Sequence, residues 1–389
     1  MLKSIHIQHY KSLSDIRIYF NNVNVLVGQN ATGKSNIIDA LRFIKDAYTY
    51  DLDHAITDRG GIEVLRQYSP TKPFMMSISV DFNYQIPGVE AIFPASYSLK
   101  LSSSKAGYKV DSEYAEWSER LIHQIENNKF THVIQNFIYE RDVNGKVTLN
   151  GAEIDSVIPS DQLGIRLMRR AKSIFDGAFT QMRFASMFPN TLRIPTRPDQ
   201  DRRLKEDCSN WASVIKAMRQ RKQDAGLQRV ISYMSKVIPG LQNVTVKTAG
   251  GYLVPQFLVQ DRPDSRPHYY DALQLSDGTL RLFGMLLTLY QSPQPTFIAM
   301  EEPEQMVHPG ILNLFVDAIR EVSTRSQVML TTHSPYLLDL FKAEEIRVVY
   351  LRHGETRVSS IRHAQVKMTK DGLMRLSEIM SLDGLQPQE

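Results

Sequence analysis

The residues whose types and spacing best support chemistry lie between Gly28 and Ser35 and read GQNATGKS. Gly28 and Gly33 let the backbone turn tightly, so that successive amide groups can point at phosphate oxygens. Lys34 adds a positive charge for the β and γ phosphates of a triphosphate, and Ser35 offers a hydroxyl to Mg²⁺. The pattern GxxxxGK[ST] therefore predicts a triphosphate site with Mg²⁺, against the alternative of a glycine-rich turn that ends in Lys-Ser by chance.

A second group of reactive residues is the acidic pair Glu301 and Glu302, which follows the largely apolar run 296–300. Such a strand can hold Mg²⁺ and polarise water, because the carboxyl ends of parallel strands open on the same edge of a sheet as the phosphate loop. We expect Glu301 to serve the metal, directly or through water, and Glu302 to act as the general base. Either carboxylate alone could be an ordinary surface charge, but two in succession favour the catalytic interpretation.

A histidine and a helix start complete the candidate groups. His333 follows the run 328–332, so we expect it to reach the γ phosphate from a neighbouring strand. The alternative is a hydrogen-bonded histidine at a strand end. Ser276 or Thr279 stands where helix starts prefer hydroxyl residues, which predicts a helix running to about Tyr290.

These residues need strands and helices that bring them together. Val23 to Val27 is a β-branched run typical of a buried strand, and Asn36 to Ile44 has a helical pattern. The glycine loop therefore joins a strand to a helix. Two further strands are expected before it, at Leu2 to Ile7 and Ile16 to Phe20.

The later chain alternates between strand and helix patterns. From Phe74 to Asn150 the sequence predicts strands, with a hairpin turn at Asn144-Gly145. After Ile158 it predicts helices at residues 162–171, 211–221 and 226–237, with an irregular connection at 189–207. Strands return from Val244, and the last elements expected are a helix at 309–324, strands at 328–331 and 346–351, and a helix near 373–380.

Composition indicates a soluble globular protein of 389 residues, enough for one large domain or two ordinary ones. No run of about 18 apolar residues predicts a membrane span, and the first residues enter a strand pattern instead of an apolar signal segment. The single cysteine, Cys208, excludes an intramolecular disulfide and a zinc site built from several thiolates. The expected compartment is the cytoplasm.

The net charge of +4 is unevenly distributed along the chain. Between Asp161 and Val230 there are fifteen Lys and Arg and seven Asp and Glu, so this basic segment carries +8 and the remainder carries −4. Such a segment suits a polyanion such as DNA or RNA. The alternative is a set of solvated helix faces, because no groove-reading or aromatic-interleaved motif accompanies the charge.

Four stretches together resemble the ABC-type AAA ATPases of the RecF and SMC class: Gly28 to Ala40, Ser-Asp-Gly-Thr at 276–279, Glu-Glu-Pro-Glu at 301–304 and Thr-Thr-His-Ser-Pro at 331–335. Within that class the chain is most similar to stand-alone ATPases related to the ATPase half of overcoming-lysogenisation-defect (OLD) nucleases. Residues 209–212, Ser-Asn-Trp-Ala, resemble a further element of those chains. The resemblance implies an α/β P-loop NTPase fold of ABC-ATPase type, with a mixed sheet around the phosphate loop, an antiparallel β lobe and a helical insertion.

The resemblance also implies roles for individual residues. Lys34 and Ser35 would belong to the Walker A motif, Glu301 and Glu302 to Walker B, and His333 would be the switch histidine. Two protomers of this class meet head to tail around two ATP molecules, so Ser276 and Gly278 of one protomer would touch the γ phosphate held by the other. The complete expected set comprises the catalytic residues Lys34, Glu302 and His333, the metal ligands Ser35 and Glu301, and the nucleotide contacts Gly28, Asn30, Ala31, Thr32, Gly33, Lys34, Ser35, Asn36, Ser276 and Gly278.

The sequence departs from the pattern of this class at several positions. Asp277 replaces the Gly of transporter signatures, and Glu301 replaces an Asp, whose shorter side chain would bind Mg²⁺ more tightly or allow faster turnover. His308 replaces an Asp in the expected D-loop, residues 306–309. The glutamine that contacts metal and water in this class is not identified, and Gln67 is a candidate.

The expected parts are an ATPase lobe with the phosphate loop and an antiparallel β subdomain (1–158), a helical basic insertion (159–243), a second ATPase lobe with signature, Walker B and switch histidine (244–345) and a C-terminal tail (346–389). The first functional hypothesis is a slowly hydrolysing, ATP-dependent homodimer that acts as a switch on duplex DNA, in repair or anti-phage defence. The second is a nucleotide-gated scaffold for a separate effector such as a nuclease or toxin, because the residues after Phe341 are too few for a TOPRIM nuclease domain. A membrane-transporter subunit is disfavoured by the Glu-Glu-Pro-Glu and His308-Pro309 features.

Overall fold

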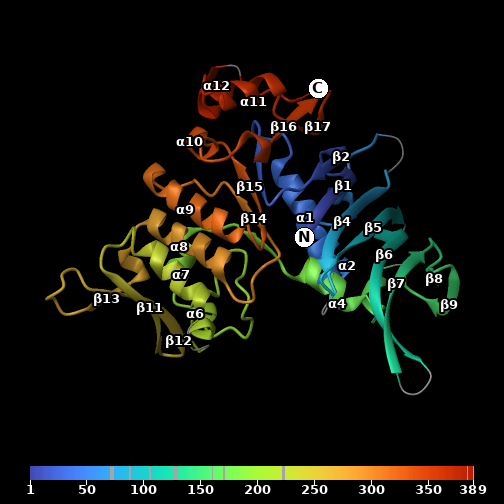
Figure 1. Cartoon of the computed structure of the whole chain (residues 1–389), viewed down its shortest axis with the longest axis horizontal. Helices are drawn as coiled ribbons and strands as arrows, with labels where there is room; N and C mark the ends of the chain where they lie inside the picture. The colour runs from blue at the N-terminus through green and yellow to red at the C-terminus, as the bar shows by residue number, and fades with distance from the viewer. Residues whose placement is uncertain are drawn as a thin grey trace.

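A computed structural model of the protein describes residues 1–70, 74–86, 89–104, 107–125, 129–159, 161–169, 171–220, 224–382 and 384–388. Within these residues the strands form sheets of eight, six and three strands. Figure 1 shows the eight-stranded sheet on one side of the molecule and the three-stranded sheet on the other. The six-stranded sheet and the phosphate loop lie between them.

The six-stranded sheet carries the candidate site. Its order is β10 (Met182–Ala185), β14 (Phe297–Glu301), β15 (Gln327–Thr332), β3 (Val23–Val27), β16 (Ile346–Arg352) and β17 (Glu355–Ser360). The strands from β10 to β16 are parallel to one another, and β17 runs antiparallel to β16. The sheet is therefore mixed, as the sequence predicts, and the carboxyl ends of its parallel strands share one edge.

The eight-stranded sheet is antiparallel throughout and forms the β lobe expected in the first half of the chain. Its order is β2 (Leu13–Tyr19), β1 (Leu2–Tyr10), β4 (Met76–Gln85), β5 (Ile92–Ser104), β6 (Gly107–Ile125), β7 (Lys129–Arg141), β8 (Lys146–Leu149) and β9 (Ala152–Val157). The turn predicted at Asn144-Gly145 connects β7 to β8, and Gly145 has the positive φ of 80° that favours glycine.

The three-stranded sheet consists of β11 (Leu241–Ala249), β12 (Tyr252–Val259) and β13 (His268–Asp271). The helices are α1 (Lys34–Thr49), α2 (Leu52–Thr57), α3 (Ile62–Leu65), α4 (Lys172–Phe175), α5 (Pro189–Arg193), α6 (Trp211–Gln220), α7 (Ala225–Met234), α8 (Asp277–Tyr290), α9 (Pro309–Val322), α10 (Pro335–Leu338), α11 (His363–Lys370) and α12 (Leu376–Leu382). Among the described residues, no helix is both long and apolar enough to cross a membrane.

The six-stranded sheet is buried on both faces because its side chains alternate between two hydrophobic cores. Along β3, Leu26 packs in the core shared with α1 and the eight-stranded sheet, whereas Val25 packs in the core shared with α8 and α9. Along β14, Ala299 and Met300 divide in the same way. This explains why these strands read as continuous apolar runs.

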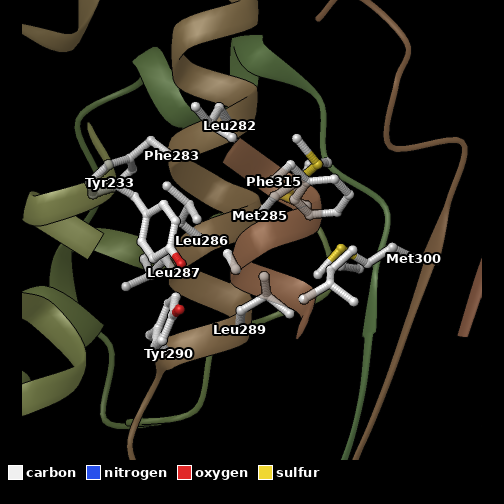
Figure 2. Packing of buried hydrophobic residues seen from close by; sticks show 14 of the residues in the cluster. Tyr233, Leu282, Phe283, Met285, Leu286, Leu287, Leu289, Tyr290, Met300 and Phe315 are labelled. Atoms are coloured by element: carbon white, nitrogen blue, oxygen red, sulfur yellow. The ribbon is translucent and has the colours of Figure 1, made fainter. Parts of the chain in front are cut away.

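Helix α8 is buried around its whole circumference from Leu280 to Tyr290. Figure 2 shows Tyr233 of α7 on one side of α8, and Phe315 of α9 with Met300 of β14 on the other. The packing fixes the start of α8, where the expected signature residues lie, relative to β14, whose last residue is Glu301.

The helix predicted at residues 162–171 is wrong. The structure has a 3₁₀ turn at Ile165–Leu167 and begins α4 only at Lys172. The buried carboxylate of Glu113 accepts hydrogen bonds from the amides of Gly164, at 2.7 Å, and Ile165, at 3.1 Å. A side chain from the β lobe thus binds the first amides of the 3₁₀ turn, which have no partner within the turn.

Two of the expected parts contribute strands to the six-stranded sheet. The range 159–243 contains β10, a strand of the six-stranded sheet, so that range is not purely helical. The range 346–389 begins with β16, which pairs with β3 directly beside the phosphate loop. The irregular connection expected at 189–207 also contains the short helix α5, and the last helix spans Leu376–Leu382.

Candidate nucleotide site

The phosphate loop connects β3 to α1 and has a backbone suited to an anion. Ala31 and Gly33 have positive φ angles of 63° and 101°, which turn successive amides toward the inside of the loop. Within the described residues, no side chain caps the start of α1 and no acidic residue lies in its first turn. The first amides of this 16-residue helix and the positive end of its dipole are thus left for a ligand. The loop fits a phosphate group.

Lys34 crosses the concave side of this loop. Its Nζ donates hydrogen bonds to the carbonyl oxygens of Gly28, at 2.9 Å, and Gln29, at 2.8 Å. Burial lowers the pKa of Lys34, while the negative charge of Glu302 raises it. Lys34 is therefore close enough to the acidic pair for the two groups to interact, and its carbonyl partners can be exchanged for phosphate oxygens.

The glycines of the loop are required by close packing as well as by backbone conformation. A Cβ atom at Gly28 would collide with the carbonyl oxygen of Val349 on β16, and one at Gly33 would lie 2.5 Å from Oγ1 of Thr356. The same Thr356 hydroxyl donates to the carbonyl oxygen of Thr32 at 2.9 Å. The strands β16 and β17 thus support the loop, a role that the sequence pattern did not indicate.

The acidic pair and the histidine meet at the carboxyl edge of the sheet. Glu301 ends β14, and Glu302 follows with a φ of 44°, a conformation that costs energy in a residue other than glycine. Oε1 of Glu302 lies 3.7 Å from Nε2 of His333, which follows β15. Gln305 donates to the second carboxylate oxygen of Glu302. Because β14, β15 and β3 are neighbouring parallel strands, Glu302, His333 and Lys34 follow strand ends along one edge of the sheet.

Glu304 links the acidic pair to the histidine and was not among the expected site residues. Its Oε1 accepts hydrogen bonds from the hydroxyl of Thr332, at 2.6 Å, and from the amide of His333, at 3.0 Å. The bonds fix the loop that carries His333 against the loop that follows β14. The Glu-Glu-Pro-Glu pattern contains this residue, but the spacing alone does not distinguish it from an exposed charge.

Glu301 has an unexpected cationic neighbour in Arg42. Nη2 of Arg42 lies 3.7 Å from Oε1 of Glu301, and Nε of Arg42 lies 3.1 Å from Oε2 of Glu206. Among the described residues, no group of three or more His, Cys, Asp or Glu side chains is suited to a metal ion. Mg²⁺ usually keeps waters and phosphate oxygens among its ligands, so the Ser35 hydroxyl and the Glu301 carboxylate fit its needs.

The signature residues lie at the start of α8. Ser276 is exposed and caps the helix, since its Oγ accepts from the amide of Thr279 at 3.2 Å. A Cβ atom at Gly278 would lie 2.7 Å from the carbonyl oxygen of Met306, so glycine permits the helix to approach the D-loop. Asp277 pairs with Arg193 of α5. The described contacts of these residues are with the D-loop and α5, not with the phosphate loop of the same chain.

Two family models match the sequence, "AAA ATPase domain" over residues 1–155 and "AAA domain, putative AbiEii toxin, Type IV TA system" over residues 254–339. The structure resembles that of an SMC head bound to the C-winged helix domain of ScpA, with a TM-score of 0.57, 14% identity and coverage of 94% of this chain and 99% of that chain. A second SMC head, with an extended coiled coil and bound to the C-terminal domain of ScpA derived from Pyrococcus furiosus, has a TM-score of 0.54, 13% identity and coverage of 96% and 99%. The chain has the SMC-head ATPase fold.

A short stretch also matches curated sequences. The DNA replication and repair proteins RecF of Limosilactobacillus reuteri, strain DSM 20016 and subspecies reuteri strain JCM 1112, are each 40% identical over 42 residues. The match covers 10% of this chain and 11% of those chains, so the chain spans about a tenth of the length of these relatives. The family models thus match AAA domains over two parts of the chain, the solved structures show an SMC-head fold, and the relation to OLD nucleases stays a prediction.

Gln67, the candidate for the glutamine that contacts metal and water, lies beside β1. Nε2 of Gln67 donates to Oγ of Ser14 at 2.7 Å, and Oε1 of Gln67 lies 3.1 Å from Nδ1 of His9, so Gln67 is held beside β1. The strand next to β14 is β10, and its carboxyl end is followed by Ser186. The position on the shared edge that neighbours the acidic pair is thus occupied by serine.

His308, in the expected D-loop, stands at the start of α9. It caps α9, since its Nδ1 accepts a hydrogen bond from the amide of Gly310 at 3.1 Å. Arg281 is a further residue that the sequence did not indicate. It is buried and donates to the carbonyl oxygens of Met187, at 2.8 Å, and Glu302, at 3.0 Å, and thereby connects α8 to the backbone of the expected base.

Proposed function

We propose that the protein binds ATP with Mg²⁺ and hydrolyses ATP slowly. The observation that carries the proposal is the arrangement of Lys34, Glu302 and His333, which follow the neighbouring parallel strands β3, β14 and β15 at one edge of the six-stranded sheet. Lys34 and the amides of the phosphate loop bind the β and γ phosphates, and Ser35 and Glu301 hold the metal ion. When bound, the ion would neutralise part of the negative charge of the phosphates.

The proposed roles at the reacting end follow from the protein's own contacts. Glu302 accepts the proton of the attacking water, and the Gln305 amide orients its second carboxylate oxygen. His333 reaches the γ phosphate from the loop after β15, where Glu304 holds its backbone. The substitution of Glu301 for aspartate is consistent with a slow reaction, because the longer side chain must adopt a more restricted conformation to bind the metal.

The experiment that tests this function is a measurement of phosphate release by the purified protein with ATP and Mg²⁺. Duplex DNA at low salt is added in a parallel reaction, and the Glu302→Gln variant serves as the blank. Turnover above the blank supports an ATPase, and stimulation by DNA supports a DNA-linked switch. No turnover above the blank in either reaction would contradict the catalytic proposal.

We further propose that a second copy of the chain covers the carboxyl edge when ATP is bound. Large apolar side chains in the segments at this edge are exposed: Phe188 at 61%, Met306 at 65% and Tyr336, in α10, at 68%. They follow β10, β14 and β15, whose carboxyl ends adjoin the phosphate loop. Clustered exposed apolar residues suggest an interaction surface, and the exposed Ser276 is free to reach a nucleotide on another protomer.

The Ser276→Arg variant should bind ATP as a monomer but should not dimerise. The long cationic side chain would occupy the space that a partner's γ phosphate needs, whereas the phosphate loop of the same chain is not in contact with Ser276. Light scattering with ATP and Mg²⁺ in the Glu302→Gln background, where nucleotide persists, measures the mass. A variant that still doubles its mass with ATP would refute the head-to-tail arrangement.

Two observations bear on the partner of this switch. The RecF stretch supports DNA repair, and the name of the second family model, which mentions a toxin, supports a role in defence. Several cations of the basic segment are used within the chain, however: Arg193 pairs with Asp277, and Arg219 donates to the carbonyl oxygen of Val244. This internal use favours the second candidate, a nucleotide-gated scaffold for a separate effector. DNA binding that weakens steeply with salt would favour the first candidate.

A further inference from the structure

Arg42 lies among carboxylates beside the proposed metal site. Its Nη2 lies 3.7 Å from Glu301, its Nε lies 3.1 Å from Glu206, and its Nη1 lies 3.8 Å from Asp39. Asp39 already has other partners, since Lys11 and Arg59 lie 2.5 and 2.9 Å from its oxygens. The guanidinium is therefore shared mainly between Glu301 and Glu206.

The position of Arg42 on α1 explains why it reaches the metal side of the site. Arg42 follows Ser35 by seven residues, so two turns of helix place both on the same face. Its guanidinium lies over the ring of Phe184 on β10, 5.2 Å from the ring centroid. The ring supports the cation between β14 and the connection that carries Glu206.

We propose that Arg42 is an internal cation that neutralises Glu301 until a divalent metal binds there, and that Glu206 then retains Arg42. This inference rests on the proposed ATP and Mg²⁺ site. A divalent ion on Glu301 repels a guanidinium a few ångströms away, so the two cations compete for one carboxylate. Glu206 offers Arg42 an alternative partner that it already contacts, and no large movement is needed.

The competition links the metal site to the basic segment, which contains Glu206. The backbone oxygen of Glu206 accepts a hydrogen bond from the amide of Ser186, at 2.9 Å, in the loop after β10. That loop leads into α5, whose Arg193 pairs with Asp277 of the signature. A shift of Arg42 from Glu301 to Glu206 therefore affects a segment that contacts Asp277, at the edge where the second copy is proposed to bind.

The proposal predicts opposite changes in metal affinity when Arg42 and Glu206 are replaced. Arg42→Met removes the competing cation and should tighten divalent-metal binding by about tenfold, or about 1.4 kcal/mol. Glu206→Gln removes the alternative partner, leaves Arg42 with Glu301 and should weaken metal binding. If Arg42 instead only orients Glu301, Arg42→Met should weaken metal binding as well.

The experiment measures Mn²⁺ binding by the electron paramagnetic resonance signal of free Mn²⁺, in the presence of a slowly hydrolysed ATP analogue. Lys45→Met is the matched control, because Lys45 lies one turn further along α1, 3.9 Å from Glu206 and over the same Phe184 ring, but is not paired with Glu301. Because Lys45 contacts Glu206 but not Glu301, its removal should raise the Mn²⁺ affinity much less than Arg42→Met does. Thermal melts of all variants establish that the fold is retained.

The outcomes separate this inference from the function on which it rests. If the unmodified protein binds the analogue without any Mn²⁺ dependence, the proposed metal site itself is wrong. If it binds Mn²⁺ with the analogue but Arg42→Met binds Mn²⁺ equally or more weakly, the competition is refuted and the site stands. Tighter binding by Arg42→Met together with weaker binding by Glu206→Gln is the result that supports it.

Discussion

The Lys34→Ala variant should lose ATP binding. Removing the charged partner of a buried, hydrogen-bonded charge pair costs about 2–5 kcal/mol, which is a loss of roughly thirtyfold to several thousandfold in affinity. Lys34 is the cation that the phosphate loop directs across its own concave side, through its bonds to Gly28 and Gln29. Titration with a fluorescent ATP analogue measures the loss.

The control for this variant must separate a missing phosphate contact from a disordered loop. Lys34 also stabilises the loop through its two carbonyl bonds, so its removal frees those carbonyls. Lys45→Ala removes a lysine from the same helix away from the loop and should bind the analogue normally. A Lys34→Ala protein that melts like the unmodified one and binds ATP with unchanged affinity would contradict the phosphate-loop interpretation.

The parts of the fold that the sequence predicts are those whose periodicity is set by burial. Val23–Val27 is a strand with the predicted bounds, since every residue in it is buried between two cores. Helix α8 begins after Ser276 because the Ser276 hydroxyl accepts a hydrogen bond from the amide of Thr279, which has no carbonyl partner within the helix. Both signals are local, so the sequence contains them in full.

The elements that the sequence missed depend on distant residues. Strand β10 has only four residues, one of them an arginine, and becomes a strand because β14 offers it a parallel edge. In place of the expected helix at 162–171 there is a 3₁₀ turn, whose first amides are bound by Glu113, far away in sequence. Neither segment has a periodic pattern that reveals its distant partner, so the sequence alone did not predict the structure of either segment.

The same distinction applies to the candidate site. Lys34 lies in a motif that predicts a helix start, and Glu302 lies in a motif that predicts a strand end. Both follow strands of the six-stranded sheet in the structure. Arg42 and Thr356 act through contacts with residues from other parts of the chain: Arg42 with Glu301 and Glu206, and Thr356 with Thr32. A single sequence has no signal for such neighbours, because an arginine on a helix or a threonine on an edge strand is common without any functional role.

The Glu302→Gln variant should bind ATP normally and turn it over about 10²-fold or more slowly, the cost of losing a positioned proton acceptor. The substitution should not move the side chain, because neighbours fix the backbone at this position. The amide of Glu302 donates to the carbonyl oxygen of Thr331 at 3.0 Å, and its own carbonyl oxygen accepts from Arg281 at 3.0 Å. Glutamine has the same length and keeps an oxygen for Gln305. The main change is therefore the loss of a basic carboxylate.

Gln305→Ala is the matched comparison for this variant. It removes the amide that contacts Glu302 but leaves the carboxylate and its pairing with His333, so turnover should fall only a few-fold. Single-turnover phosphate release, with ATP binding measured in parallel, distinguishes lost chemistry from lost affinity. If Glu302→Gln retains most of the turnover of the unmodified protein, the proton acceptor is another group at the same edge. Glu304 would then be the next carboxylate to replace, because its Oε2 is buried without a hydrogen-bond partner among the described residues.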